Sequence, residues 1–160
     1  MTYHTITLTL TEKEDLETFF QFQLNIEARY LAAFTAKGST DKIAYLEKYT
    51  KFLTDPTIHM RTIKADNQIV GSIAKFVMDN EAEVTYWIDR KFWDKGIGSR
   101  ALSDFLEMEQ TRPLYGRVAF DNYGSQRILE KCGFVKTGTQ KGFANARQAP
   151  IEEYIYKLLV

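Results

Sequence analysis

The sequence predicts an α+β fold with α/β/α layers, in which helices cover both faces of a mixed, mostly antiparallel, seven-stranded sheet. Alternating apolar residues separated by short turns in the middle of the chain indicate an antiparallel meander. A strand, a glycine-containing loop, a helix and another strand follow, and this order requires the two strands to run parallel. The 160 residues suit a single domain, residues 1–160, which can bury a core without disulfides.

The N-terminal region should contain one strand and one or two helices. HTITLTL, from His4 to Leu10, alternates threonine with apolar residues, which is typical of a half-buried strand. Apolar residues between Glu12 and Tyr30 fit the helices, and Thr11 with Glu14 resembles a capping box.

A further helix and a three-stranded meander are expected next. A helical stripe of apolar residues runs from Asp41 to Leu53 and ends at Asp55-Pro56. Short turns at 65–67 and 79–80 then separate three strand-like segments. These strands are expected at Ile58–Lys64, Gln68–Phe76 and Ala82–Asp89.

The second half of the chain opens with a glycine loop, Arg90 to Gly98, that leads into a helix stopped by Arg112-Pro113. After it comes a short helix, Asn122 to Cys132, with Asn122 as its N-cap and Gly133 just past its end. The remaining strands are expected at Leu114–Phe120, Phe134–Thr139 and Glu152–Leu159, with Gly142–Pro150 as a loop.

Composition narrows the class of protein. The formal net charge is zero, whereas a nucleic-acid or anionic-membrane partner favours a basic surplus, so neither partner is expected. The single cysteine, Cys132, allows no internal disulfide and favours a reducing, cytoplasmic location. The N-terminal residues resemble neither a signal peptide nor a membrane span.

The segment WDKGIGSRAL, Trp93 to Leu102, has three interpretations. The first is a tight turn. The second is a dinucleotide fingerprint, because Gly96-x-Gly98-x-x-Ala101 is followed by Asp121 at about the expected spacing. We reject it, because six residues separate the glycines from the preceding strand and the chain has room for only one βαβ unit. The third is a loop for the pyrophosphate of coenzyme A.

The third interpretation depends on a resemblance. YWIDRKFWDKGIGSRAL followed by VAFDNYGSQRILEKCGF resembles the GNAT family of acetyl-CoA-dependent N-acetyltransferases, and most of all its ribosomal-protein alanine N-acetyltransferase branch. The likeness covers Glu83 to Phe134, and the flanking strands fit the family order. The first 55 residues match only in layout.

The resemblance implies that acetyl-CoA is the co-substrate and that the glycine loop binds its pyrophosphate through backbone N–H groups and the positive end of the following helix. Asp94 and Ser99 depart from the branch, which often has glycine and threonine there. The binding residues implied here are Lys95, Gly96, Ile97, Gly98, Ser99 and Arg100.

The resemblance also implies that the strand from Glu83 to Ile88 splays from the strand ending at Phe120. Pantetheine would enter this gap and pair with backbone near Trp87 and Ile88. Asn122 and Ser125 would face the thiol end of the cofactor.

Acetyl transfer to an amine needs a base, donors for the oxyanion and a thiolate that can leave. We expect Glu83 to be the base, directly or through water, and a backbone N–H near Ile88 to bind the oxyanion. Many family members have a tyrosine acid where this chain has Leu129, so Ser125 is the expected acid. Tyr86 and Tyr123 are the reserve candidates.

The other chemically versatile residues are not expected to be catalytic. His4 and His59 are isolated on strands, Cys132 suits a small core position, and no cluster has the spacing of a metal site. The acceptor should contact the N-terminal helices and Gly142–Pro150. Aromatic residues that could line its pocket are Trp87, Trp93, Tyr30, Phe34 and Phe143.

The sequence thus predicts an N-acetyltransferase that acts on a primary amine, a small molecule or a protein N-terminus, by direct attack in a ternary complex. The alternative is a non-catalytic sensor or partner domain that binds acyl-CoA, which Leu129 and Asp94 favour. The resemblance also allows a homodimer.

Overall fold

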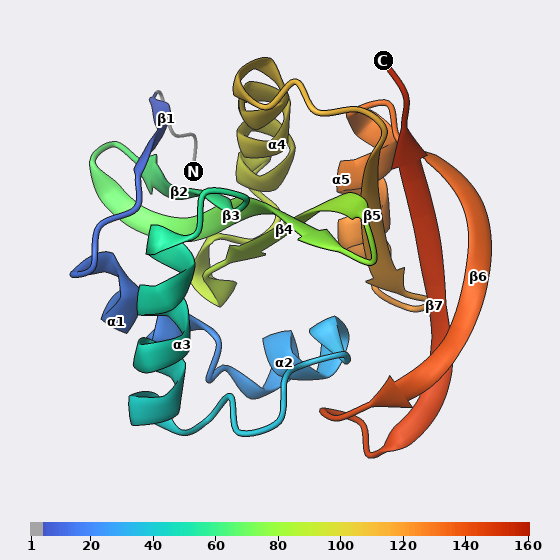
Figure 1. The fold of residues 1–160 in the computed structure, drawn as a ribbon, viewed down its shortest axis with the longest axis horizontal. Coiled ribbons are helices and arrows are strands. Elements are labelled where there is room, and N and C mark those ends of the chain that lie inside the picture. The colour runs from blue at the N-terminus through green and yellow to red at the C-terminus, as the bar shows by residue number, and fades with distance from the viewer. Residues whose placement is uncertain (1–4) are drawn as a thin grey trace.

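The structure, a computed structural model, describes residues 5–160 and confirms the mixed, mostly antiparallel sheet (Figure 1). Its seven strands have the order β1-β2-β3-β4-β5-β7-β6, and β4 with β5 is the parallel pair. The strands are β1 (Ile6–Leu10), β2 (His59–Ala65), β3 (Gln68–Met78), β4 (Glu81–Ile88), β5 (Leu114–Ala119), β6 (Val135–Ala144) and β7 (Ala149–Leu158).

Helices cover both faces of the sheet, as predicted. On one face α4 and α5 pack over a core that includes Ile73, Val84 and Phe105. On the other face α1 and α3 enclose a second cluster around Leu16, Phe20 and Tyr45, and α2 lies beside them (Figure 1). The helices are α1 (Asp15–Phe22), α2 (Ile26–Ala32), α3 (Lys42–Thr54), α4 (Ile97–Met108) and α5 (Tyr123–Lys131), with a short 3-10 turn at Arg90–Phe92.

Local capping explains where three of the helices begin. The side chains of Asn25, Asp41 and Asn122 accept hydrogen bonds from the backbone N–H three residues later, at 2.9, 3.1 and 3.3 Å. The capping box predicted at Thr11 and Glu14 is wrong, because no side chain caps α1. The Thr11 hydroxyl instead accepts a hydrogen bond from Thr62 across to β2, at 3.1 Å.

The segment Gly142–Pro150 is not a loop, which corrects the prediction. β6 continues to Ala144, β7 begins at Ala149, and Phe143 is the register partner of Pro150. Pairing of β7 with β5 ends at Glu153, so Pro150 lies where β7 has a strand on one side only and its missing N–H is tolerated. Residues 145–148 form the tip of a long hairpin, which lies next to α2 (Figure 1).

At the N-terminus, the strand predicted from His4 begins at Ile6, and His4 lies outside the described residues. No helix within residues 5–160 is long and apolar enough to cross a membrane.

Candidate functional site

The two parallel strands diverge after a short contact. Within the described sheet β4 and β5 pair at Ala82 with Leu114 and at Glu83 with Tyr115, and no further pair follows although β4 continues to Ile88. The predicted splay is therefore present. It opens toward the carboxyl ends of both strands, where α/β units commonly bind ligands.

A cavity of about 1100 Å³ joins this opening to the face covered by α1 and α3. Glu83 and Trp87 from β4 line it together with Asn122 and Ser125 from the start of α5. The Trp87 indole N–H is buried and has no hydrogen-bond partner among the described residues. A ligand carbonyl in the cavity could accept that hydrogen bond, so the site fits an amide-containing arm such as pantetheine.

Glu83 is buried and belongs to a charged cluster that the sequence analysis missed. Its Oε2 accepts a hydrogen bond from Arg117 Nε at 3.4 Å, and the same guanidinium donates to Glu153 Oε1 at 3.3 Å. Arg117 also donates to Gln140 Oε1 at 3.0 Å. Burial raises the pKa of Glu83 above its ordinary value, and the Arg117 charge only partly opposes this effect. A buried carboxyl with a raised pKa is suited to accept a proton near neutral pH.

Two hydroxyl groups that line the cavity lie in contact. Ser125 Oγ lies 2.8 Å from the Tyr86 hydroxyl, and burial raises the pKa of Tyr86. Leu129 lines the same cavity and carries no hydroxyl, whereas Tyr123 is 62% exposed and does not line it. Of the reserve candidates, the structure places Tyr86 beside Ser125.

The glycine loop forms the N-terminus of α4. Gly96 is the N-cap residue with φ of +77°, and no side chain caps the helix there. Ile6, Lys95, Gly96, Ile97 and Arg100 line a small cavity of about 180 Å³, separate from the larger one. Uncapped N–H groups and two basic side chains suit this small cavity to a phosphate.

Gly98 also has a packing role that the sequence analysis did not predict. A Cβ at this position would lie 2.6 Å from Ile128 Cδ1, so the missing side chain lets α4 approach α5 closely. Gly98, Ser99 and Ile88 line neither cavity.

The backbone conformation of Gly96, with φ of +77°, favours glycine at this position. A Gly96→Ala variant places a Cβ at positive φ and should lose about 1–2 kcal/mol of unfolding free energy, measured by urea denaturation. Gly124 on α5 is the matched control, because its φ is not positive and a Cβ there meets nothing within 4 Å. Gly124→Ala should be neutral or slightly stabilising. Equal stability of the two variants would refute the assignment.

Three other residues that the sequence analysis discussed, His59, Cys132 and Asp121, lie outside both cavities. His59 is not isolated, since its Nδ1 is 2.5 Å from Glu109 Oε1. Cys132 packs against the core, where burial raises its pKa, and its Sγ contacts the Ser99 carbonyl at 3.5 Å. Asp121, the acid of the rejected dinucleotide interpretation, pairs with Arg147. Within residues 5–160 no group of three or more His, Cys, Asp or Glu side chains could hold a metal ion.

The aromatic residues of the cavity are only partly those expected. Trp87 and Phe34 line it, whereas Trp93, Tyr30 and Phe143 do not. The cavity is also lined by aromatic residues that the sequence analysis did not name as pocket residues, among them Tyr45, Tyr49, Phe52 and Phe76. The period of α3 had predicted an apolar stripe of Ile43, Leu46, Tyr49 and Leu53. Ile43 is exposed and Tyr45 is buried instead, and only the fold shows that Tyr49 meets a cavity.

Comparisons with known proteins agree with this geometry. The sequence model of the family described as "Acetyltransferase (GNAT) domain" matches residues 5–135. No curated protein matches the chain significantly by sequence.

Solved structures share the fold at low identity. Spermidine N-acetyltransferase from Vibrio cholerae, in complex with CoA and spermine, has a TM-score of 0.80 and 20% identity over 96% of this chain and 95% of its own. The ribosomal L7/L12 alpha-N-protein acetyltransferase RimL, in complex with CoA, has a TM-score of 0.79 and 17% identity over 100% of this chain and 97% of its own. The microcin C7 self-immunity acetyltransferase MccE, in complex with acetyl-CoA and AMP, has a TM-score of 0.79 and 18% identity over 98% of this chain and 93% of its own.

Proposed function

Because this chain belongs to the GNAT acetyltransferase family, we propose that it transfers the acetyl group of acetyl-CoA to a primary amine of a small molecule or a protein N-terminus. The observation that carries the proposal is the single cavity that joins Glu83 to Asn122 and Ser125 across the splay of β4 and β5. Because the amine and the thioester would share this cavity, direct attack in a ternary complex is the mechanism we propose.

We propose that the N-terminus of α4 holds the pyrophosphate, with Lys95 and Arg100 adding positive charge. Ile97, Gly98 and Ser99 contribute backbone N–H groups, and Gly96 supplies the turn that exposes them. Trp87, Ile88 and Asn122 hold the pantetheine arm beside the splay. When bound, acetyl-CoA supplies an acetyl group activated as a thioester.

The residues of the chain would then move protons. An ammonium group has no lone pair, so Glu83, directly or through water, takes the proton that the amine must lose. As the nitrogen–carbon bond forms and the carbon–sulfur bond breaks, Ser125, beside Tyr86, would give its hydroxyl proton to sulfur and regain a proton from the attacking nitrogen. The net result is an amide and a thiol. A backbone N–H near Ile88 and the Ser125 hydroxyl would donate hydrogen bonds to the carbonyl oxygen as it gains negative charge.

Thermal denaturation with acetyl-CoA, desacetyl CoA and NAD tests the binding part of the proposal. A ligand at a hundred times its Kd stabilises by about 2.7 kcal/mol, so both CoA species should raise Tm and NAD should not. Lys95→Glu should weaken this shift, and Lys91→Glu, the same charge change on an exposed residue outside both cavities, should not. A shift with NAD alone would overturn the proposal.

Turnover tests the catalytic part. Thiol release from acetyl-CoA should depend on an added primary amine. The second candidate is the acyl-CoA sensor, which Leu129 favours because it leaves the cavity without the hydroxyl that the family commonly has there. A sensor would show the full CoA-dependent rise in Tm and no release of thiol with any amine.

A further inference from the structure

The carboxyl proposed as the base is flanked by an aromatic ring on the next strand. Phe76 on β3 is the register partner of Glu83, and Ser72 is the partner of Trp87. Directly opposed residues share one face of a sheet, with Cβ atoms about 4.5–5.5 Å apart. An amine that reaches Glu83 therefore lies against the Phe76 ring, on the face covered by α1 and α3.

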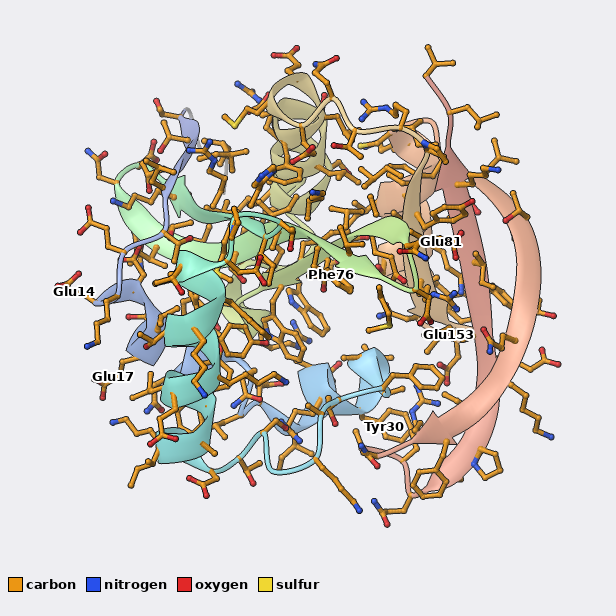
Figure 2. All side chains as sticks on the ribbon, in the orientation of Figure 1. Glu14, Glu17, Tyr30, Phe76, Glu81 and Glu153 are labelled. Atoms are coloured by element: carbon orange, nitrogen blue, oxygen red, sulfur yellow. The ribbon has the colours of Figure 1, made fainter. Side chains whose placement is uncertain are left out.

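The helix opposite supplies more aromatic surface. Tyr45 and Tyr49 of α3 stack with ring centroids 4.2 Å apart, and Tyr49 meets Phe52 edge to face at 5.1 Å. All three line the cavity with Phe76 (Figure 2 shows the side chains that project between α2, α3 and the strands). Burial raises the pKa of Tyr45 and Tyr49, so both phenols stay neutral. The ammonium group of Lys48 lies over this wall, 5.9 Å from the centroid of the Tyr49 ring and 5.8 Å from that of the Phe52 ring.

The charges that line the cavity balance. Its carboxylates are Asp55, Asp79, Glu83 and Glu153, and its basic groups are Lys37, Lys48, Arg117 and Lys141. Arg117 contacts both Glu83 and Glu153. A polyamine carries several ammonium groups and needs a surplus of carboxylates, which this balance does not provide.

The hairpin of β6 and β7 is joined to the segment after α2. The N–H of Ala146 donates to the Ala33 carbonyl at 3.0 Å, and Asn145 Nδ2 donates to the Thr35 carbonyl at 2.8 Å. These bonds join the tip of the hairpin to the segment after α2. The tip itself lies outside the cavity, which is lined by Phe34 and Thr35 of that segment and by Gln140, Lys141 and Gly142 of β6.

We infer that the acceptor is a small primary amine carried on an aromatic body, which packs between Phe76 and the α3 aromatic residues while its nitrogen reaches Glu83. This inference rests on the proposed acetyl transfer. It names the class of acceptor, which the family membership leaves open.

The test compares kcat/KM for 2-phenylethylamine, propylamine, spermidine and a peptide with an N-terminal alanine. 2-Phenylethylamine should exceed each of the others by at least about tenfold, because one small apolar contact already changes kcat/KM by about 10–200-fold. Preference for spermidine or for the peptide would overturn the inference and leave the proposed function intact. No turnover with any amine, despite binding of acetyl-CoA, would overturn both.

A variant pair locates the preference. Phe76→Ala should lower kcat/KM for 2-phenylethylamine by about tenfold or more and lower that for propylamine by a smaller factor, because propylamine has no aromatic body to pack against the ring. Phe143→Ala is the matched control, since Phe143 is 57% exposed and lies outside the cavity. If Phe76→Ala does not fold, Tyr49→Ala replaces it with the same expectation. An equal loss for both amines would contradict the inference.

Discussion

Glu83→Gln should lower kcat/KM for amine acetylation by about 10²–10⁴, the usual contribution of a general base. The amide keeps the shape of the carboxyl and can still accept the hydrogen bond from Arg117, but it cannot accept the proton of the amine. Steady-state release of thiol from acetyl-CoA measures the effect. Unchanged affinity for acetyl-CoA, measured by thermal shift, would show that the cofactor site is intact.

The pH dependence gives this prediction a second readout. As the proposed base, Glu83 must be deprotonated to act, so kcat/KM should fall as pH falls through its pKa. Because burial raises that pKa, the fall of kcat/KM on the acid side of the pH profile, here called the acid limb, should occur at a higher pH than the ordinary pKa of a glutamate. Glu83→Gln should remove this limb. A variant that retains both the limb and the activity would exclude Glu83 as the base.

Two neighbours should move the limb in opposite directions. The Arg117 charge lowers the pKa of Glu83 and the Glu153 charge raises it. Arg117→Met should therefore shift the acid limb to higher pH, and Glu153→Gln should shift it to lower pH. A purely structural role for Arg117 and Glu153 would change the rate or the stability without these opposite shifts.

Much of the fold could be predicted because its signals are local. Asp41 and Asn122 cap the N-termini of α3 and α5. Short turns at 65–67 and 79–80 separate the strands of the meander. Gly133, with φ of +93°, lies just after the end of α5. The glycine loop, too, is a short contiguous signal.

The parts that could not be predicted depend on non-local pairing. Only the register of β3 with β4 places Phe76 beside Glu83. Arg117 lies on β5 and pairs with Glu83 on β4 and with Glu153 on β7, so this cluster depends on the order of three strands. The close packing of Gly98 against Ile128 could not be predicted, because Ile128 lies on another helix. Gly142 and Pro150 indicated a loop, although cross-strand pairing extends the hairpin past both.

Arg147→Met should be strongly destabilising, since Arg147 fixes the hairpin tip. Its two terminal nitrogens donate to the two oxygens of Asp121 at 2.8 and 2.7 Å, and its Nε donates to the Tyr30 carbonyl at 2.7 Å. The guanidinium also lies 4.0 Å from the centroid of the Tyr30 ring. Breaking a buried pair by removing one partner costs about 3–5 kcal/mol. The Arg147 side chain is 6% exposed but that of Asp121 is 25%, so we expect the lower end of this range.

Urea denaturation measures this loss, and an Arg127→Met variant controls for the change in charge. Arg127 is exposed on α5, where surface substitutions usually change stability by less than about 0.5 kcal/mol. Asp121→Asn completes a double-mutant cycle: if the pair is coupled, Arg147→Met should cost less in the Asp121→Asn background than in the wild type. Additive effects would mean that Arg147 stabilises the hairpin through its contacts with Tyr30 and not through Asp121. The bonds of Ala146 and Asn145 remain in the variant, so the cavity should survive. A rise in KM for the amine would show that Arg147 also shapes the cavity.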